Sequence, residues 1–184
     1  MPDAREVLLA ELRGHALVIG EVTLSSGQKA SYYVDARRAL LRPAGFRAAG
    51  KLIASAAREL GAQAVGGPVM AAIPLACAAI AVPEGEELVG FFVRKERKQH
   101  GMQRWVEGPV EAGTKCLVVE DTVTTGGSTV AAIERMREEG LTIVGGLCVV
   151  DRQAGGREAI EAAAAAPFRS LVTIDELHPD RPDR

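Results

Sequence analysis

Apolar residues follow two patterns along this chain, a helical period and short continuous runs. The helical period is clearest from Pro43 to Leu60, where apolar residues recur every three or four positions and Gly61 follows. The runs 88–93 and 143–150 are typical of strands covered on both faces, and we expect 88–93 in the middle of a parallel sheet. Alternation of such runs with helical segments predicts an α/β fold whose sheet has right-handed crossovers.

Weaker signals complete the predicted order of elements. Further helices are predicted at 3–13, around Pro74, at 128–139 and at 158–166, and further strands at 22–24, 31–35, 64–67, 115–119 and 171–174. The strands 22–24 and 31–35 should form a hairpin. The terminal segment HPDRPDR has no residues suited to packing, and we expect it to be mobile.

Size and composition fit one globular domain over residues 1–184. A formal net charge of −2 argues against a general nucleic-acid binder. Cys77, Cys116 and Cys148 stand singly among apolar residues, so we expect buried thiols in a reducing compartment. The longest apolar stretch, 70–82, is shorter than the roughly 20 residues that span a bilayer, and no secretory leader is visible. A cytoplasmic protein without membrane contact is expected.

The segment LVVEDTVTTGGSTV, from Leu117 to Val130, joins a predicted strand to a predicted helix. The start of a helix has backbone N–H groups without partners and a partial positive charge, so a loop of small residues there can surround a phosphate. Gly126 and Gly127 allow the backbone to approach closely. The hydroxyl donors are Thr122, Thr124, Thr125, Ser128 and Thr129.

Two acids, Glu120 and Asp121, precede this loop and cannot bind phosphate themselves. They suit the vicinal hydroxyls of a ribose, or a metal shared by the sugar and its phosphates. An isolated acid pair before a glycine-rich turn is more often a solvated strand end. The order acid, acid and hydroxyl-rich loop favours a ribose 5-phosphate site, and the absence of GxGxxG and of a Lys after the glycines excludes two other nucleotide loops.

This segment resembles the phosphoribosyl diphosphate (PRPP) motif of the type I phosphoribosyltransferases, with Glu120 where the family commonly has Asp. The resemblance implies their fold, a mainly parallel central sheet flanked by helices, with a small N-terminal hood and a flexible catalytic loop. It also implies Mg2+, held mainly by PRPP and water and not directly by protein side chains. The PRPP contacts implied within the motif are Glu120, Asp121, Thr122, Val123, Thr124, Thr125, Gly126, Gly127 and Ser128.

Four residue pairs fall at the ends of predicted strands, three of them charged and one made of two glycines. Ligands of parallel sheets bind beyond the carboxyl ends of the strands, so these pairs should meet at one site. They are Gly66-Gly67, Arg94-Lys95, Glu120-Asp121 and Asp151-Arg152.

The segment RKERKQHGMQR, residues 94–104, holds five Lys or Arg and one acid. A charge run alone is as well explained by a solvated surface. Because this run directly follows a buried strand and lacks an apolar period, we expect a mobile lid over 94–109. Cations there would stabilise the negative charge of a departing diphosphate, and closure would exclude water.

The pattern R-K-x-x-K-x-H-G in this lid is similar to the catalytic loop of the orotate phosphoribosyltransferases. The resemblance implies that Lys98 is the catalytic cation and that Arg94, Lys95 and His100 also contact PRPP. In that family the loop reaches the neighbouring subunit's site. A homodimer is therefore implied.

Asp151-Arg152 followed by Gly155-Gly156 resembles the family segment whose Arg binds orotate. A lone Arg at a strand end is more often a surface ion pair, but a forked planar donor suits the carboxylate of orotate. By the same resemblance Thr124 is a second orotate contact, and 1–40 forms a hood over the base. Ser25 stands where many members have Lys, and Ala71-Ala72 stand where members often have Gly.

Together these resemblances imply a pentosyltransferase that converts orotate and PRPP into orotidine 5′-monophosphate and pyrophosphate during UMP biosynthesis. Two alternatives stay open. A purine or uracil phosphoribosyltransferase would share the PRPP motif but would not need Arg152. A non-catalytic regulator that binds PRPP and nucleic acid would be expected to carry a basic face or an added segment, which this sequence does not show.

Overall fold

A computed structural model describes residues 3–23, 29–97 and 104–182 of the chain. Its centre is a six-stranded sheet in the order β5-β4-β3-β6-β7-β8, parallel except for β5. The strands are β3 (Ala64–Pro68), β4 (Val89–Val93), β5 (Val106–Glu107), β6 (Lys115–Val123), β7 (Thr142–Asp151) and β8 (Phe168–Thr173). The predicted α/β fold with a mainly parallel sheet is confirmed.

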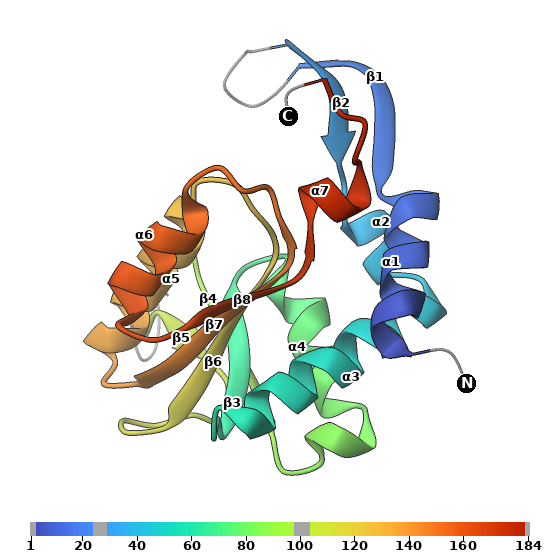
Figure 1. Cartoon of the computed structure of the whole chain (residues 1–184). Coiled ribbons are helices and arrows are strands. Elements are labelled where there is room, and N and C mark those ends of the chain that lie inside the picture. The colour runs from blue at the N-terminus through green and yellow to red at the C-terminus, as the bar shows by residue number, and fades with distance from the viewer. Residues whose placement is uncertain (1–2, 24–28, 98–103, 183–184) are drawn as a thin grey trace.

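Helices cover both faces of this sheet (Figure 1). One face carries α1 (Ala4–His15), α3 (Pro43–Glu59) and α4 (Ala72–Ile80), and the other carries α5 (Gly127–Glu138) and α6 (Gly156–Ala164). Alternate residues of β6 serve the two cores: Leu117 and Val119 face the first, Cys116 and Val118 the second. The shorter helices are α2 (Arg37–Leu40), the 3-10 helix η1 (Pro83–Gly85) and α7 (Ile174–Leu177).

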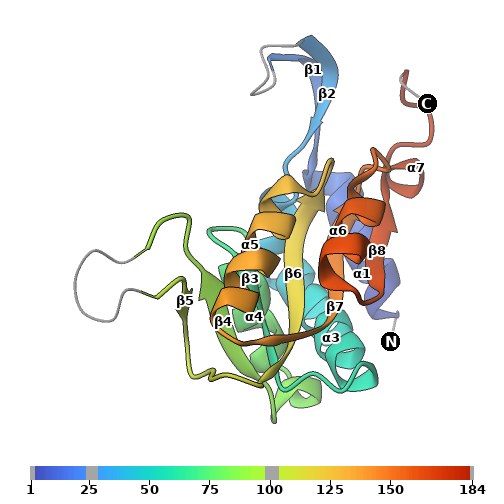
Figure 2. The ribbon, with the colours of Figure 1, turned by 90° about the vertical axis from the view of Figure 1, so that its left-hand side faces the viewer.

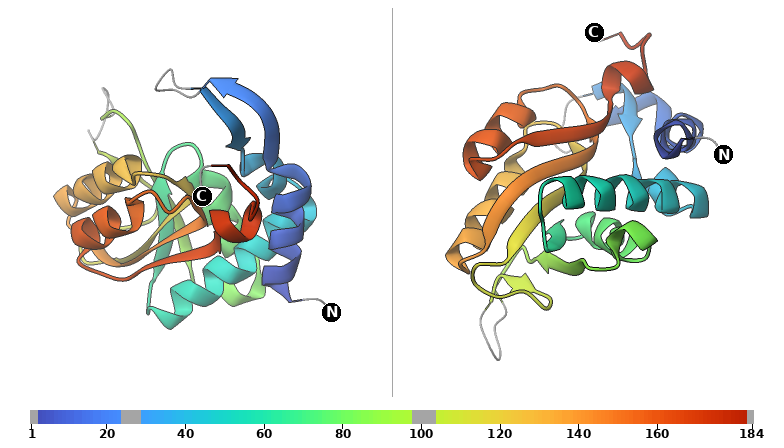
Figure 3. Two further views of the ribbon diagram at one scale, coloured as in Figure 1. Left: turned by 45° about the horizontal axis from the view of Figure 1, so that its top comes forward. Right: turned by 60° about the horizontal axis from the view of Figure 1, so that its bottom comes forward.

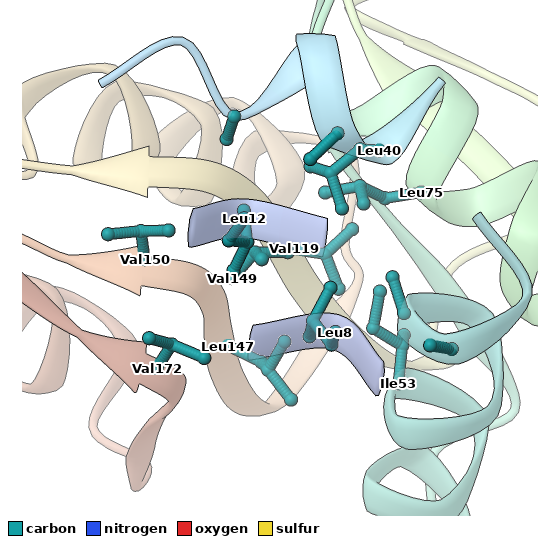
Figure 4. Packing of buried hydrophobic residues seen from close by; sticks show 14 of the residues in the cluster. Leu8, Leu12, Leu40, Ile53, Leu75, Val119, Leu147, Val149, Val150 and Val172 are labelled. Carbon is teal, nitrogen blue, oxygen red and sulfur yellow. The ribbon is translucent and has the colours of Figure 1, made fainter. Parts of the chain in front are cut away.

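The N-terminal 40 residues do not form one unit. Leu8 and Leu12 of α1 are fully buried, and they lie beside Ile53, Leu147 and Val149 in the main core (Figure 4). Only the antiparallel hairpin of β1 (Leu17–Thr23) and β2 (Lys29–Val34) projects beyond the carboxyl end of β6 (Figure 2). Within residues 1–40, the hairpin therefore stands at this end of the sheet while α1 packs in the main core.

Several predictions about elements were wrong. The run 88–93 does not lie in the middle of the sheet, because its strand β4 has only the two-residue β5 beyond it. An apolar run shows that a strand is covered, not where it lies in the order of strands. Residues 106–107 form β5, at a position where no strand was predicted; the mobility predicted for 94–109 stays a prediction, and 98–103 lie outside the described residues. Cys77 is exposed on α4, whereas Cys116 and Cys148 are buried as expected.

The C-terminal tail also packs, contrary to the prediction. In the segment HPDRPDR the His178 ring contacts Tyr32 of the hairpin. Just before it, Ile174 and Leu177 of α7 are buried in the main core. Figure 3 shows α7 beside the hairpin at the end of the sheet where the parallel strands finish. No helix in the described ranges is long and apolar enough to cross a bilayer.

Candidate functional site

A cleft of about 430 Å³ opens at the carboxyl ends of β3 and β6. In the sheet, β3 has β4 as its neighbour on one side and β6 on the other, so the order of strands reverses between β3 and β6. The helices that follow these two strands, α4 and α5, therefore pack on opposite faces of the sheet. Such a switch point is where open α/β sheets bind ligands. The cleft is lined by Tyr33, Val34, Asp35, Arg37, Met70, Ala71, Lys95, Asp121, Thr122, Thr124 and Arg152.

The two acids of the motif lie on β6 itself, because the strand continues to Val123 and not only to 119 as predicted. Glu120 is 6% exposed, and its carboxylate accepts hydrogen bonds from Ser128 Oγ (3.2 Å) and from the Asp121 N–H (3.2 Å). Asp121 reaches the cleft and accepts the Thr122 N–H at 2.6 Å.

Burial, followed by the neighbouring charge of Asp121, raises the pKa of Glu120 to about 7. Burial also raises the pKa of Asp121, against the attraction of Arg37. Two adjacent carboxylates held from water gain from a partner that supplies hydroxyl donors or positive charge. The acid pair is therefore ready to bind sugar hydroxyls or a cation.

The hydroxyl-rich loop leads into α5, as the sequence predicts. Gly126 precedes the helix with φ of +78°, and no side chain in the described ranges caps the first turn. The first-turn N–H groups are thus available to an anion, with Thr125, Gly127 and Ser128 exposed beside them. The Thr122 hydroxyl, buried at the cleft wall, has no hydrogen-bond partner in the described part of the chain.

Val123 is placed differently from its neighbours in the motif. Its side chain is 2% exposed and packs in the core between the sheet and α5. Its carbonyl accepts the Arg152 N–H at 2.8 Å, which ties the loop after β7 to the end of β6. A PRPP contact by Val123 would therefore use the backbone.

Gly156, the second glycine of the Gly155-Gly156 pair, packs against the hydroxyl-rich loop. A Cβ on Gly156 would stand 2.4 Å from Val123 Cγ1 and 2.6 Å from the Thr124 carbonyl oxygen. Gly126 is equally confined, since its Cβ would stand 2.9 Å from the Gly156 carbonyl oxygen. These glycines bring the two loops together, so that Thr124 and Arg152 line the same cleft as predicted.

Arg152 leaves the end of β7 toward the hairpin. Its guanidinium donates to Tyr32 Oη at 3.2 Å and lies 5.2 Å from the centre of that ring. The preceding Asp151 is 3% exposed and pairs with Arg157 at 3.6 Å, away from the cleft. Arg152 is therefore the cation that this loop offers to a ligand.

The basic segment divides at its start. Lys95 lines the cleft, whereas Arg94 pairs with Glu107 of β5 at 3.5 Å. The predicted residues Lys98 and His100, and also Ser25, lie outside the described residues. Opposite the segment, the Trp105 indole N–H donates to Glu138 of α5 at 2.8 Å, and Arg135 lies 4.5 Å from the Trp105 ring centre. Trp105, near the end of the basic segment, is thus attached to α5, the helix that begins at the hydroxyl-rich loop.

Sequence reasoning missed Arg37 and Met70 as cleft residues. Arg37 pairs with Asp35 at 3.0 Å, and that contact raises the pKa of the guanidinium further. The signal was present in the sequence, because Arg37 follows shortly after the predicted strand 31–35 at the same end as the other polar pairs. Met70 lies in the loop after β3 and is 74% exposed.

The oxygen donors of the acid pair have the chemistry that Mg2+ prefers. Mg2+ takes oxygen ligands and usually retains waters and substrate phosphates. Glu120 and Asp121 supply carboxylate oxygens with raised pKa, but no group of three or more His, Cys, Asp or Glu within the described ranges could hold a metal. Glu120 and Asp121 are therefore the carboxylates of this site whose chemistry suits the ion.

Comparisons with known proteins agree with this geometry. The family model for the phosphoribosyl transferase domain matches residues 37–165. The chain is 47% identical to an orotate phosphoribosyltransferase of Corynebacterium glutamicum, covering 95% of this chain and 94% of that protein. It is 46% identical to the Streptomyces avermitilis protein of the same name, over 96% and 98%.

Solved structures give the same result. The Mycobacterium tuberculosis orotate phosphoribosyltransferase in complex with Fe(III) dicitrate matches with a TM-score of 0.86 at 41% identity, over 96% of this chain and 99% of that one. The structure described as its complex with PRPP matches with a TM-score of 0.81 at 36% identity, over the same shares.

Proposed function

This chain belongs to the orotate phosphoribosyltransferases, within the phosphoribosyl transferase domain family, and we propose that it transfers ribose 5-phosphate from PRPP to orotate. A bond forms between the orotate N1 and the ribose C1, and the bond from C1 to the diphosphate breaks. Orotate gives up its N1 proton, and pyrophosphate leaves. The products are orotidine 5′-monophosphate, a step of UMP biosynthesis, and pyrophosphate.

One observation carries the proposal: a ribose-binding acid, the phosphate loop and an arginine suited to a carboxylate share one cleft. Asp121, Thr124 and Arg152 all line it, and α5 begins beside it with first-turn N–H groups that no described side chain caps. The anionic carboxylate of orotate suits the planar fork of Arg152. A neutral purine or uracil would leave this guanidinium without an anionic partner.

The residues divide the chemistry among them. Glu120 and Asp121 accept hydrogen bonds from the ribose hydroxyls, while the loop Thr124–Ser128 binds the 5-phosphate. Charge develops on the ribose as an oxocarbenium-like state and on the departing diphosphate, so Lys95, and Lys98 as the principal cation, stabilise the leaving oxygens. Arg94 and His100 are proposed to join them when the segment 94–109 covers the cleft and excludes water.

Mg2+ is proposed as the cofactor. When bound it neutralises the diphosphate oxygens, and Glu120 and Asp121 are the side chains closest in chemistry to its needs. Their own proposed contribution is to hold the ribose hydroxyls. This agrees with an ion held mainly by PRPP and water.

We propose a homodimer whose basic segments are exchanged between subunits. An exposed apolar stripe along α4 supports this proposal, because a second copy of the chain could cover it. Met70 is 74%, Ile73 36% and Ile80 40% exposed, and Cys77 is exposed between them. The spacing places Ile73, Cys77 and Ile80 on one side of the helix. Because Met70 also lines the cleft, the stripe continues into the site, and a copy seated there would lie next to the substrates.

A cytoplasmic location is proposed as well. The three cysteines are free, and reducing compartments keep thiols in that state. The net charge of −2 favours small-molecule substrates over nucleic acid as partners.

A panel of bases tests the proposed function. The protein would be incubated with PRPP, Mg2+ and either orotate, uracil, adenine or hypoxanthine, and pyrophosphate release would be measured. Release with orotate alone is expected. Release with another base but not with orotate would overturn the assignment of the base while leaving the PRPP site intact.

A further inference from the structure

We infer that His178, in the C-terminal segment 174–181, is a positioning residue for the base. It acts through Tyr32, which holds the guanidinium of Arg152 in the cleft. The inference rests on the proposed function, because it deepens the account of how orotate is recognised. It assigns a role to the part of the chain that sequence reasoning left as a mobile tail.

The first link joins Arg152 to Tyr32. Tyr32 is 3% exposed on β2, so its ring is fixed within the structure. Arg152 donates to the Tyr32 oxygen at 3.2 Å and lies over the ring at 5.2 Å from its centre. A long arginine side chain loses considerable rotamer freedom when it binds a ligand. A contact that already orders the side chain before the ligand arrives lowers this entropic cost of binding.

The second link joins Tyr32 to His178. The two rings meet edge to face, with centres 5.1 Å apart and planes at 80°. This is a preferred geometry for aromatic pairs. Tyr32 therefore has Arg152 at its hydroxyl and ring and the His178 ring as an aromatic neighbour.

The third link anchors His178 to the domain. The helix α7 before it starts with a capping box between Thr173 and Glu176, and Ile174 and Leu177 are buried in the main core. Arg5 of α1 pairs with Glu176, and Arg13 donates to the Glu176 carbonyl at 2.7 Å. The segment therefore connects the core and α1 to the hairpin, and it is a firm support for Tyr32.

The consequence is specific to one substrate. PRPP is proposed to bind through β6, the loop after it and the basic segment, whereas the ring of His178 contacts Tyr32 of the hairpin. Removing the His178 ring should therefore weaken orotate binding through Arg152 while PRPP binding stays the same. A residue that only stabilised the fold would affect both substrates together.

Steady-state kinetics of His178→Ala, His178→Phe and Tyr32→Phe test the inference. The interaction energy of an aromatic pair corresponds to a change of about threefold to tenfold in affinity. His178→Ala should therefore raise KM for orotate by that factor and leave KM for PRPP unchanged. His178→Phe keeps a ring and should restore KM. Tyr32→Phe removes the oxygen that Arg152 contacts and should also raise KM for orotate. In the double variant Tyr32→Phe/His178→Ala the two effects should not add, since both act through Arg152.

Asp180→Ala is the matched control, because Asp180 is exposed in the same segment and should leave both KM values unchanged. The inference is overturned if His178→Ala leaves KM for orotate unchanged, raises both KM values equally, or is not restored by Phe. Failure of the proposed function looks different, since the unmodified protein would then not consume orotate at all.

Discussion

Gly156 lies so close to Thr124 that a methyl group on Gly156 would stand 2.6 Å from the Thr124 carbonyl oxygen. This contact joins the two loops that carry the proposed phosphate and base ligands. A side chain there meets backbone on one side and the buried Val123 on the other, so neither neighbour can move away cheaply. The second glycine of the pair is thus required by packing at the site.

Gly156→Ala should therefore displace the phosphate loop. Overpacking of this kind costs about 1–3 kcal/mol, and we expect a lower Tm together with a KM for PRPP raised about tenfold or more. Gly14→Ala is the control, because a Cβ at Gly14 meets nothing within 4 Å. An unchanged KM for PRPP in Gly156→Ala would show that the loop does not depend on this contact.

Stability should depend on pH through Glu120. Its pKa rises from an ordinary 4.5 to about 7 on folding, so between these values the folded protein binds more protons than the unfolded chain. The free energy of unfolding then falls as pH rises through this window and levels off above it. Glu120→Gln removes the ionisation and should gain on the order of 1–3 kcal/mol at pH 8 and little at pH 5.

Thermal unfolding of both proteins at the two pH values measures this gain. Glu6→Gln, on the exposed side of α1, controls for the general loss of one negative charge. An equal gain for Glu120→Gln at both pH values would contradict the buried-acid account.

Binding of PRPP should also respond to the protonation of Glu120. The carboxylate must be ionised to accept from the ribose hydroxyls, so below about pH 7 binding has to release its proton. The Kd for PRPP with Mg2+ should therefore fall more steeply between pH 6 and pH 8 in the unmodified protein than in Glu120→Gln. Titration calorimetry measures both slopes, and the ligand's own protonation is common to them. Identical slopes would remove Glu120 from the binding step.

Exchange of the basic segment between subunits predicts complementation. Lys98→Ala should reduce turnover by orders of magnitude without lowering Tm. Asp121→Asn should be inactive because its cleft has lost the acid that binds the ribose hydroxyls. In a mixed dimer one cleft is intact and receives an intact segment from its neighbour. After subunit exchange the mixture should regain about a quarter of normal activity.

Mass analysis would show whether mixed dimers have formed. If they have and the mixture stays inactive, each basic segment serves the cleft of its own subunit. Lys98→Ala protein exchanged with itself is the control. Near-full activity of Lys98→Ala alone would remove Lys98 from the leaving-group role.

The sequence allowed much of the site to be predicted because parallel strands end at one edge. The segment with Asp121 and Thr124 is distant along the chain from Arg152, yet each follows an apolar run, and the rule for parallel sheets is enough to bring them together. The glycines before α5 likewise indicate a phosphate loop without knowledge of tertiary packing.

The parts that could not be predicted depend on distant partners. The tail packs through a ring edge on Tyr32, and α7 before it through pairing with Arg5, and neither leaves an apolar period in the sequence. Trp105 lies within the predicted mobile segment 94–109, which lacks an apolar period, and its partners Arg135 and Glu138 lie on a helix that follows later in the chain. Local pattern cannot show contacts of this kind.

The decisive experiment measures initial rates of orotate consumption, by the absorbance of orotate with PRPP and Mg2+ in excess, for the unmodified protein and for Arg152→Gln. The account predicts that the unmodified protein converts orotate and releases one pyrophosphate for each orotate lost. Arg152→Gln should raise KM for orotate at least tenfold, because a charged hydrogen bond to the carboxylate is lost. No loss of orotate with the unmodified protein, or equal KM values in the two proteins, would contradict it.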